Sequence, residues 1–313
     1  MTSAAPPAGG RPGRRQWVAL ATLYVAWGST YVAIRVMVET VPPLLGAGLR
    51  FLTAGAILII ALLAVGGTAR LRASRREAMA AAAVGALILC GGIGLLTLAE
   101  REVPSGLAAL IIASVPLWVV VLRRLAKQRV SRATLAGVTG GFVGVAILVL
   151  PGERAGNAPF DWLAVLLAAA LLTAIGAFLS DRLTLPRDTL LSTAIEMGCA
   201  GALLLLAALA MGETAHLELG GLSWRSLVAF IYLVVIGSVV AYSAFVWLLQ
   251  NVSTSTVATY AYVNPAVALL LGWAILSEEI TPTILVGALA VLASVALVVR
   301  REERAGEEGD SRR

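Results

Sequence analysis

Aromatic, hydroxyl and amide side chains recur at helical spacing inside runs of the sequence that are otherwise apolar. The run 17–38 carries Trp27 and Tyr31 four residues apart, and the run 254–276 carries Tyr260 and Asn264 at the same spacing. Apolar and aromatic walls with a few placed polar groups are the composition of a binding cavity for a small solute. The same side chains could instead form hydrogen bonds between neighbouring helices. We expect a solute pathway lined by seven residues: Trp27, Tyr31, Glu100, Trp118, Tyr242, Tyr260 and Asn264.

Two ionisable residues, Arg50 and Glu196, lie inside apolar runs, each about seven residues from one end. A charged residue costs roughly 2.5–3.5 kcal/mol at the centre of a membrane helix. At about 1.5 Å per residue, the two lie about 10 Å from opposite surfaces, and we expect no direct salt bridge between them. Arg50 could have a functional role or extend its side chain to lipid head groups. Glu100, at the end of the run 78–99, could carry a proton, bind solute or be an ordinary interfacial residue.

Pro116 and Pro265 each fall in the middle of an apolar run. A proline inside a helix leaves one backbone carbonyl without its N–H partner and bends the helix, which is tolerated where neighbours or a cavity satisfy that carbonyl. We interpret the two residues as helix kinks that face the solute pathway. Kinks that serve packing alone are the alternative interpretation.

The long apolar runs themselves identify the class of protein. Of the 313 residues, 59% are hydrophobic and 13% are charged, and the mean hydropathy is +0.90. Soluble domains carry about 25% charged residues, and a helix that crosses a bilayer needs about 20 apolar residues. The sequence therefore predicts an all-α integral membrane protein with ten transmembrane helices, at 17–38, 44–66, 78–99, 104–124, 133–150, 161–180, 189–211, 226–249, 254–276 and 281–299.

The Lys and Arg residues predict the orientation of these helices. The loops and ends on one side hold 19 of them, and those on the other side hold 4. Because basic residues gather in cytoplasmic loops, we expect a multi-pass protein of the inner (plasma) membrane with both tails, 1–16 and 301–313, in the cytoplasm. The net charge of +6 comes from these short clusters and indicates no nucleic-acid partner.

The two halves of the chain, 17–150 and 161–300, can be aligned with each other. Pro116 aligns with Pro265, Gly137 aligns with Gly287, and the offset stays between 145 and 150 residues. Five helices in each half place the second half upside down relative to the first. Inverted repeats of this kind are typical of secondary transporters, in which the solute site lies near the bilayer midplane between the repeats.

Two other classes of protein fit part of the pattern. A membrane-embedded enzyme would need a nucleophile with a neighbouring base, or a set of metal ligands, whereas the sequence has one histidine, His216, in a predicted loop. Cys90 and Cys199 lie inside apolar runs and are expected to be small core residues. A channel or scaffold would not need kinks that match between the halves. We therefore expect no enzymatic activity, no metal and no cofactor.

Several motifs, in order and spacing, resemble the EamA family of the drug/metabolite transporter superfamily across about residues 16–300. They are Trp27-Gly28-Ser29-Thr30, Leu49-Arg50-Phe51, Ser105-Gly106-Leu107 before Pro116-Leu117-Trp118, and Tyr262-Val263-Asn264-Pro265 before Glu279. Ala99-Glu100 and Ala241-Tyr242-Ser243 are most similar to the YedA-like branch. The resemblance implies two EamA repeats, at 17–150 and 161–300, and a central cavity lined mainly by helices 1, 3, 4, 6, 8 and 9.

The resemblance further implies a secondary transporter that exports small metabolites, amino acids or drugs by alternating access, without an ATP-binding domain. The expected partners are a small-molecule solute and membrane lipid, while coupling to protons and assembly as a homodimer are both compatible with the sequence. One departure is that Arg129 stands in the first half where the second half has Glu278 and Glu279. A role for these acids therefore does not carry over to both halves.

Overall fold

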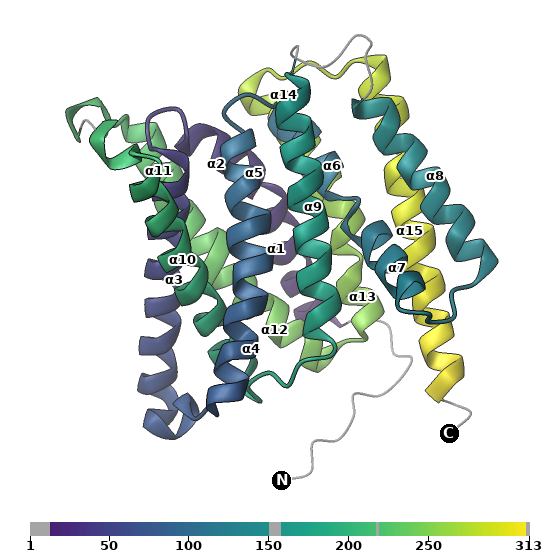
Figure 1. Cartoon of the computed structure of the whole chain (residues 1–313), viewed down its shortest axis with the longest axis horizontal. Coiled ribbons are helices and arrows are strands. Elements are labelled where there is room, and N and C mark those ends of the chain that lie inside the picture. Colours follow the sequence, from purple (N-terminus) through teal and green to yellow (C-terminus); the bar gives the residue numbers. More distant parts are fainter. Residues whose placement is uncertain (1–12, 150–157, 217–218, 311–313) are drawn as a thin grey trace.

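The computed structural model describes residues 13–149, 158–216 and 219–310, and these residues form an all-helical bundle without strands (Figure 1). Ten segments of this part of the chain are long and apolar enough to cross a membrane, which confirms the predicted fold class. They are numbered here as spans 1 to 10: Arg14–Met37, Pro43–Leu71, Arg75–Ala99, Ser105–Leu125, Arg132–Val149, Phe160–Ser180, Thr189–Ala210, Trp224–Asn251, Thr256–Leu276 and Pro282–Arg301.

Half of the spans are continuous helices and half are interrupted. The continuous ones are α3 (Pro43–Gly66, extended by the 3-10 turn η1, Gly67–Leu71), α8 (Arg132–Val149), α9 (Phe160–Ser180), α10 (Thr189–Ala210) and α15 (Pro282–Asp310). Spans 1, 4 and 9 are each broken into two helices: α1 (Arg14–Gly28) and α2 (Thr30–Met37), α6 (Ser105–Ile112) and α7 (Val115–Leu125), α13 (Thr254–Ala258) and α14 (Tyr260–Leu276). Spans 3 and 8 contain π-helical segments: α4 (Arg75–Gly85), η2 (Ala86–Gly94) and α5 (Leu95–Ala99), then α11 (Trp224–Tyr232), η6 (Leu233–Val240) and α12 (Ala241–Asn251). The short 3-10 helices η4 (Glu213–His216) and η5 (Leu219–Gly221) lie between spans 7 and 8.

The interruptions follow the internal repeat. The π-helical segments begin at Ala86 and Leu233, which are 147 residues apart and so fall within the offset between the two halves. The chain also turns after spans 4 and 9 through left-handed residues at equivalent places, Lys127 (φ 59°) and Ser277 (φ 56°). Residues other than glycine adopt this conformation uncommonly. The two halves therefore share unusual backbone geometry as well as sequence.

Two helix pairs, each with one helix from either half, frame the bundle. α3 packs along α10 and α8 packs along α15, and the two pairs lie on opposite sides of the molecule in Figure 1. Glycines allow the close approach: a Cβ on Gly201 would lie 2.9 Å from the backbone oxygen of Gly48, and one on Gly287 would lie 3.3 Å from that of Gly144. Spans 2 and 7 are equivalent in the repeat, as are spans 5 and 10. The symmetry of an inverted repeat therefore exchanges the two helices within each pair and leaves the pair itself in place.

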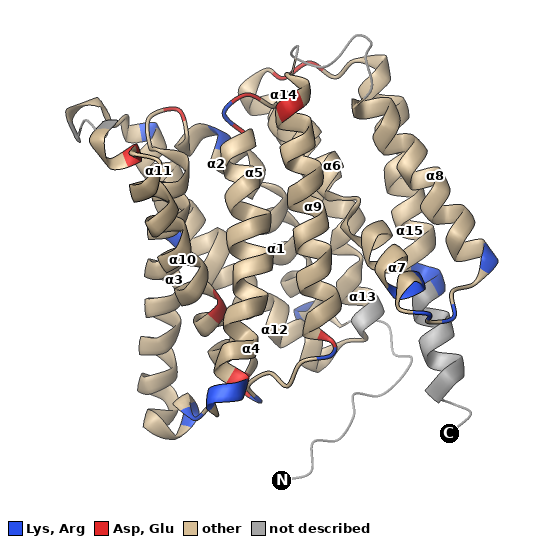
Figure 2. Ribbon diagram, in the orientation of Figure 1, with Lys and Arg blue, Asp and Glu red and all other residues tan. Residues whose placement is uncertain are grey.

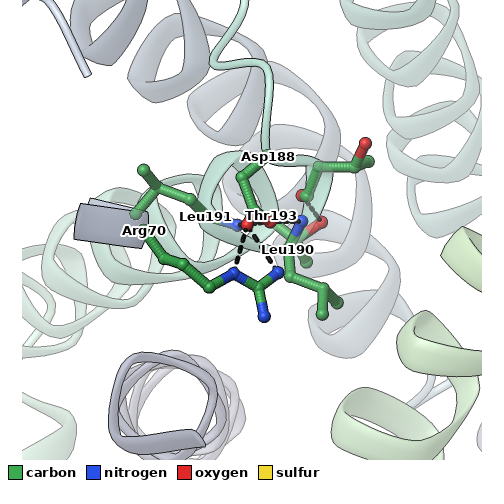
Figure 3. A network of polar contacts seen from close by, with 6 residues as sticks. Arg70, Asp188, Leu190, Leu191 and Thr193 are labelled. Carbon is green, nitrogen blue, oxygen red and sulfur yellow. Dashed lines mark hydrogen bonds and ion pairs between the residues drawn. The ribbon is translucent and has the colours of Figure 1, made fainter. Parts of the chain in front are cut away.

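Charged residues concentrate near the two ends of the bundle, and Lys and Arg are most frequent at the end drawn at the bottom of Figure 2. This end, which includes residues 70–76 and 123–132, is called the basic end below. There Arg70 donates from Nε to the carboxylate of Asp188 at 2.8 Å, and Asp188 caps α10 by accepting from the backbone N–H of Leu190 at 3.1 Å (Figure 3). The contact joins spans 2 and 7 at the basic end.

The other end of the bundle, called the opposite end below, has a counterpart to this contact. Glu213, which follows span 7, accepts hydrogen bonds from the backbone N–H groups of Leu44 at 3.3 Å and Leu45 at 2.8 Å in the first turn of α3. A carboxylate at a helix N-terminus is stabilised both by these N–H groups and by the helix dipole. Spans 2 and 7 are therefore tied together at both ends.

Candidate functional site

A cavity of about 180 Å³, called the central cavity below, lies among spans 1, 2, 3, 8 and 9. The break in span 1 at Ser29 and the π-helical segment of span 3 change which side chains face inward there. Residues from both repeats form its wall: Trp27, Thr30, Tyr31, Ile34, Arg50, Phe51, Ile93, Leu96, Tyr242, Tyr260 and Asn264.

Aromatic side chains make one rigid side of this wall. The ring centroid of Trp27 lies 5.1 Å from those of both Tyr242 and Tyr260, with interplanar angles of 71° and 76°. Edge-to-face pairs of this kind contribute about 0.5–1.5 kcal/mol each beyond their burial. Phe245 packs behind them, with its centroid 5.2 Å from that of Trp27. Spans 1, 8 and 9 are therefore held together by aromatic contacts at the depth of the cavity.

Arg50 brings a positive charge to the same wall. Its side chain is 5% exposed, and its Nε donates a hydrogen bond to Oγ of Ser238 at 3.0 Å. Its guanidinium carbon lies 5.0 Å from the centre of the Phe51 ring. The arginine therefore faces the interior of the bundle, and the extension toward lipid head groups that the sequence left open is not the conformation observed.

Asn264 is the most buried polar residue that span 9 contributes. It is 7% exposed, and its Oδ1 accepts no hydrogen bond from the described residues. The residue lines both the central cavity and a second cavity of about 140 Å³. A buried acceptor without a partner is uncommon and requires an explanation. Here it is available to a bound molecule.

The second cavity continues the path away from the central one. The two share Tyr31, Tyr260 and Asn264, and the second is otherwise lined by residues such as Pro116 of span 4 and Thr173 of span 6. A third cavity of about 310 Å³ shares Pro116 and Tyr260 with the second and extends to Arg123, near the basic end. Together the three cavities trace a route from the middle of the bundle toward the basic end.

Toward the opposite end, the described residues next to the central cavity include apolar side chains that are packed together. These residues belong to one buried cluster and are called the plug below: Ile34, Met37, Ala99, Val103 and Leu107, none more than 2% exposed. Glu100 lies beside them, fully buried, and its two carboxylate oxygens have no hydrogen-bond partner among the described residues. Its backbone carbonyl accepts a hydrogen bond from Nη1 of Arg35.

Glu278 fastens the two repeats to each other at this closed end. Its carboxylate accepts from the backbone N–H of Ser105 at 2.6 Å and of Gly106 at 3.0 Å, so it caps α6 of the other repeat. The left-handed Ser277 turns the chain toward that helix, and Gly272 leaves space, because a Cβ there would lie 2.4 Å from the carboxylate. The equivalent turn after Lys127 is followed by Gln128, not by an acid. The turn after span 4 therefore has no acid at the position equivalent to Glu278.

The residues expected to line the pathway fall into two groups. Five of the seven, namely Trp27, Tyr31, Tyr242, Tyr260 and Asn264, lie together in the wall of the central cavity. Trp118 lies elsewhere, with its ring centroid 4.7 Å from that of Phe142 on span 5, and Glu100 is buried behind the plug. Glu196 accepts a hydrogen bond from Oγ of Ser192 at 2.9 Å within its own helix and lines none of these cavities.

Some residues of the wall were not expected from the sequence. Arg50 was singled out as a charge within the membrane but was not placed in the pathway, and Thr30, Phe51 and Ile93 were not singled out. The Leu49-Arg50-Phe51 motif was a usable signal, since it places the charge in one of the ordered family motifs. The two prolines, although equivalent in the repeat, lie at different places in their helices. Pro116 is the second residue of α7, whereas Pro265 lies inside α14, six residues after the break at Thr259.

Known proteins share both the sequence pattern and the fold. The chain is 39% identical over 267 residues to the "Uncharacterized inner membrane transporter YedA" of Escherichia coli (strain K12), covering 84% of this chain and 83% of that protein. It is 26% identical to the "Probable amino-acid metabolite efflux pump" of Salmonella typhimurium, covering 88% and 91%. It is 29% identical to the "Probable terminal-alkyne amino-acid exporter" of Streptantibioticus cattleyicolor, covering 90% and 93%.

A solved structure with 18% sequence identity has the same fold, with a TM-score of 0.62 over 91% of this chain and 97% of that one. The EamA-like transporter family matches twice, at residues 16–150 and 161–300, once on each half of the inverted repeat. These matches agree with the ten spans and with the cavity between the halves. The chain belongs to the EamA-like transporter family.

Proposed function

We propose that the protein exports small metabolites, with amino acids and related compounds as the first candidates, by alternating access through the central cavity. The observation that carries the proposal is the route of three cavities that reaches the basic end while the plug closes the opposite end. A solute would enter from the basic end, and movement of the two repeats would then open the plug. The names of two relatives, an amino-acid metabolite efflux pump and an amino-acid exporter, support this class of solute.

The direction of export depends on orientation, and we place the basic end and both termini in the cytoplasm because Lys and Arg concentrate there. Single cysteines introduced in the loops 67–76 and 125–132 should react with an impermeant maleimide only from the cytoplasmic side. Cysteines in the loop 213–222 should react only from outside. The reverse pattern at any loop would contradict this orientation.

Coupling to protons is part of the proposal, with Glu100 and Glu196 as the candidate carriers. Burial without hydrogen-bond partners favours the neutral form of a carboxyl group, and both oxygens of Glu100 are in this situation. Glu100 also lies beside the plug, where a change of its charge would affect opening. Glu196 is half-buried and bonded to Ser192, so the geometry supports Glu100 more strongly.

The proposal is tested by measuring export directly. Cells with and without the gene are loaded with a panel of amino acids and other metabolites, and the excreted compounds are measured. Tyr260→Ala and Asn264→Ala should change the affinity or the range of the exported compounds, since both side chains line the central cavity. If both well-expressed variants export with unchanged kinetics, the transport route lies elsewhere. A membrane-embedded enzyme, the rival class, would instead alter a compound without moving it.

A further inference from the structure

Arg50 is a buried charged residue, and most of its N–H donors have no hydrogen-bond partner among the described residues. A guanidinium has five N–H donors, and the described residues account for one hydrogen bond, from Nε to Ser238. Among the described residues, no carboxylate oxygen lies within 4.0 Å of the guanidinium nitrogens, the distance that defines an ion pair. Ionisable residues inside membrane spans usually pair with one another or mark a pathway for solute. Arg50 lies in the wall of such a pathway, and its remaining N–H donors are available to a bound molecule.

The backbone of span 8 is shaped around this guanidinium. Gly237 and Ser238 both belong to the π-helical segment η6, a type of helix that occurs frequently at functional sites. A Cβ on Gly237 would lie 3.4 Å from Nη2 of Arg50 and 2.8 Å from Cγ2 of Thr30. The glycine therefore provides the space in which the arginine and Thr30 meet at the cavity, and the serine beside it holds Nε.

Asn264 supplies the complementary group from the other repeat. Arg50 can only donate hydrogen bonds, whereas Oδ1 of Asn264 can accept them and has no partner among the described residues. Both residues line the central cavity. A bound molecule would therefore meet a cationic donor on one wall and a neutral acceptor on another.

The rest of the cavity limits the size and the charge of that molecule. Its volume of about 180 Å³ is below the roughly 300–1,000 Å³ of pockets for drug-sized ligands. Most of the remaining wall is aromatic or aliphatic: Trp27, Tyr31, Ile34, Phe51, Ile93, Leu96, Tyr242 and Tyr260. One arginine matches one negative charge, and planar carboxylates suit its paired N–H donors.

We propose that Arg50 binds the carboxylate of a small amphipathic solute in the central cavity, and that Oδ1 of Asn264 accepts a hydrogen bond from an N–H or O–H group of the same solute. The inference rests on the proposed transport function, because it takes the central cavity as the solute site. An α-amino acid with an apolar side chain has both groups and an apolar body to place against the aromatic wall.

Two sets of related compounds separate these contacts. One set is leucine, 4-methylpentanoate, which lacks the amine, and 3-methylbutylamine, which lacks the carboxylate; the other is phenylalanine, 3-phenylpropanoate and 2-phenylethylamine. Binding to the purified full-length protein is measured as a rise in unfolding temperature with ligand concentration. In at least one set, the amino acid should bind most tightly, the carboxylate more weakly, and the amine at least about tenfold more weakly than the amino acid.

Variants assign the contacts to residues. Arg50→Gln should weaken binding of both carboxylate compounds at least about tenfold and remove their advantage over the amine. Arg50→Lys, which keeps the charge, should retain part of the preference and serves if the glutamine variant does not fold. Asn264→Ala should remove the advantage of the amino acid over the simple carboxylate. Arg35→Gln is the matched control, because Arg35 lies outside the central cavity, and it should leave the order of affinities unchanged.

The proposal is overturned if the amines bind as tightly as the carboxylates or if no compound binds. It is also overturned if Arg50→Gln, or Arg50→Lys where the glutamine variant does not fold, binds the carboxylate compounds as tightly as the wild type does. A separate measurement in liposomes distinguishes this result from a failure of the transport function. Carboxylates that bind but are not moved would leave the site in place and refute transport. Transport that is equally fast with Arg50→Gln would leave transport in place and refute the site.

Discussion

Glu278 offers a direct way to change the balance between the closed and open forms of the opposite end. Its carboxylate joins the loop after span 9 to the first turn of α6 in the other repeat. Movement of one repeat against the other would separate these groups, so the two hydrogen bonds favour the closed form. Glu278→Gln keeps the size of the side chain and one acceptor oxygen but removes the negative charge. We expect the variant to be open at the opposite end more often.

The size of the effect follows from the contacts. Hydrogen bonds to charged groups contribute about 1.5–3 kcal/mol and neutral ones about 0.5–1.5 kcal/mol, and a negative charge at a helix N-terminus adds about 0.3–1 kcal/mol. Because Glu278 is only half-buried, solvent screening places the expected loss near the lower end, at about 1–2 kcal/mol. A change of this size multiplies the ratio of open to closed molecules by about 5–30.

Thiol labelling measures this ratio. Val103 belongs to the plug and is 0% exposed, so the thiol introduced by Val103→Cys is accessible from outside only in open molecules. In a background with Cys90→Ala and Cys199→Ala, an impermeant maleimide should react about 5–30 times faster when Glu278→Gln is added. Glu279→Gln is the matched control, because this neighbouring carboxylate is exposed and makes no hydrogen bond among the described residues. Equal labelling rates in all three proteins would refute the reasoning.

Three further predictions concern packing, turnover and coupling. Gly144→Ala should lower the yield of folded protein and cost about 1–3 kcal/mol, since its Cβ would lie 2.8 Å from that of Ala290; Gly198→Ala, with open space around it, should be neutral in the same thermal-unfolding assay. Pro265→Ala should slow turnover in liposomes more than it weakens binding, because a helix without the proline resists bending; a change in binding alone would contradict this. Glu100→Gln and Glu196→Gln should abolish transport driven by a pH gradient while leaving membrane insertion intact, and normal transport by both across the pH range would exclude them as proton carriers.

Much of the fold could be predicted because it depends on the lengths and positions of the apolar runs in the sequence. Runs of about 20 apolar residues leave a chain few arrangements in a bilayer, so ten spans could be identified from the apolar runs of the sequence. Residues on one helix face could also be predicted, which is why Trp27, Tyr31 and Tyr260 lie together in the cavity as expected.

The sequence is less informative where the helices depart from regular geometry. The break before Val115 and the π-helical segments η2 and η6 change the direction in which later side chains point. The hydropathy of the sequence does not reveal these changes in helix geometry, because every residue concerned is apolar or small. Trp118, three residues beyond the break in span 4, therefore packs against Phe142 instead of the cavity. Arg50 could be recognised as unusual, but the glycine and serine that receive its guanidinium belong to a distant span.

The glycine contacts between the halves also restrict how this chain can evolve. Gly201 approaches the backbone of Gly48, and Gly287 approaches that of Gly144, so each half presents a surface that only a matching half can accept. After a gene duplication, a larger side chain at one of these positions would have to be compensated in the other copy. A chimera that joins residues 13–149 to the second half of a distant relative should therefore assemble only where the relative also keeps small residues at positions 201 and 287. Substitutions at these contact positions in one repeat are therefore constrained by the residues of the other repeat.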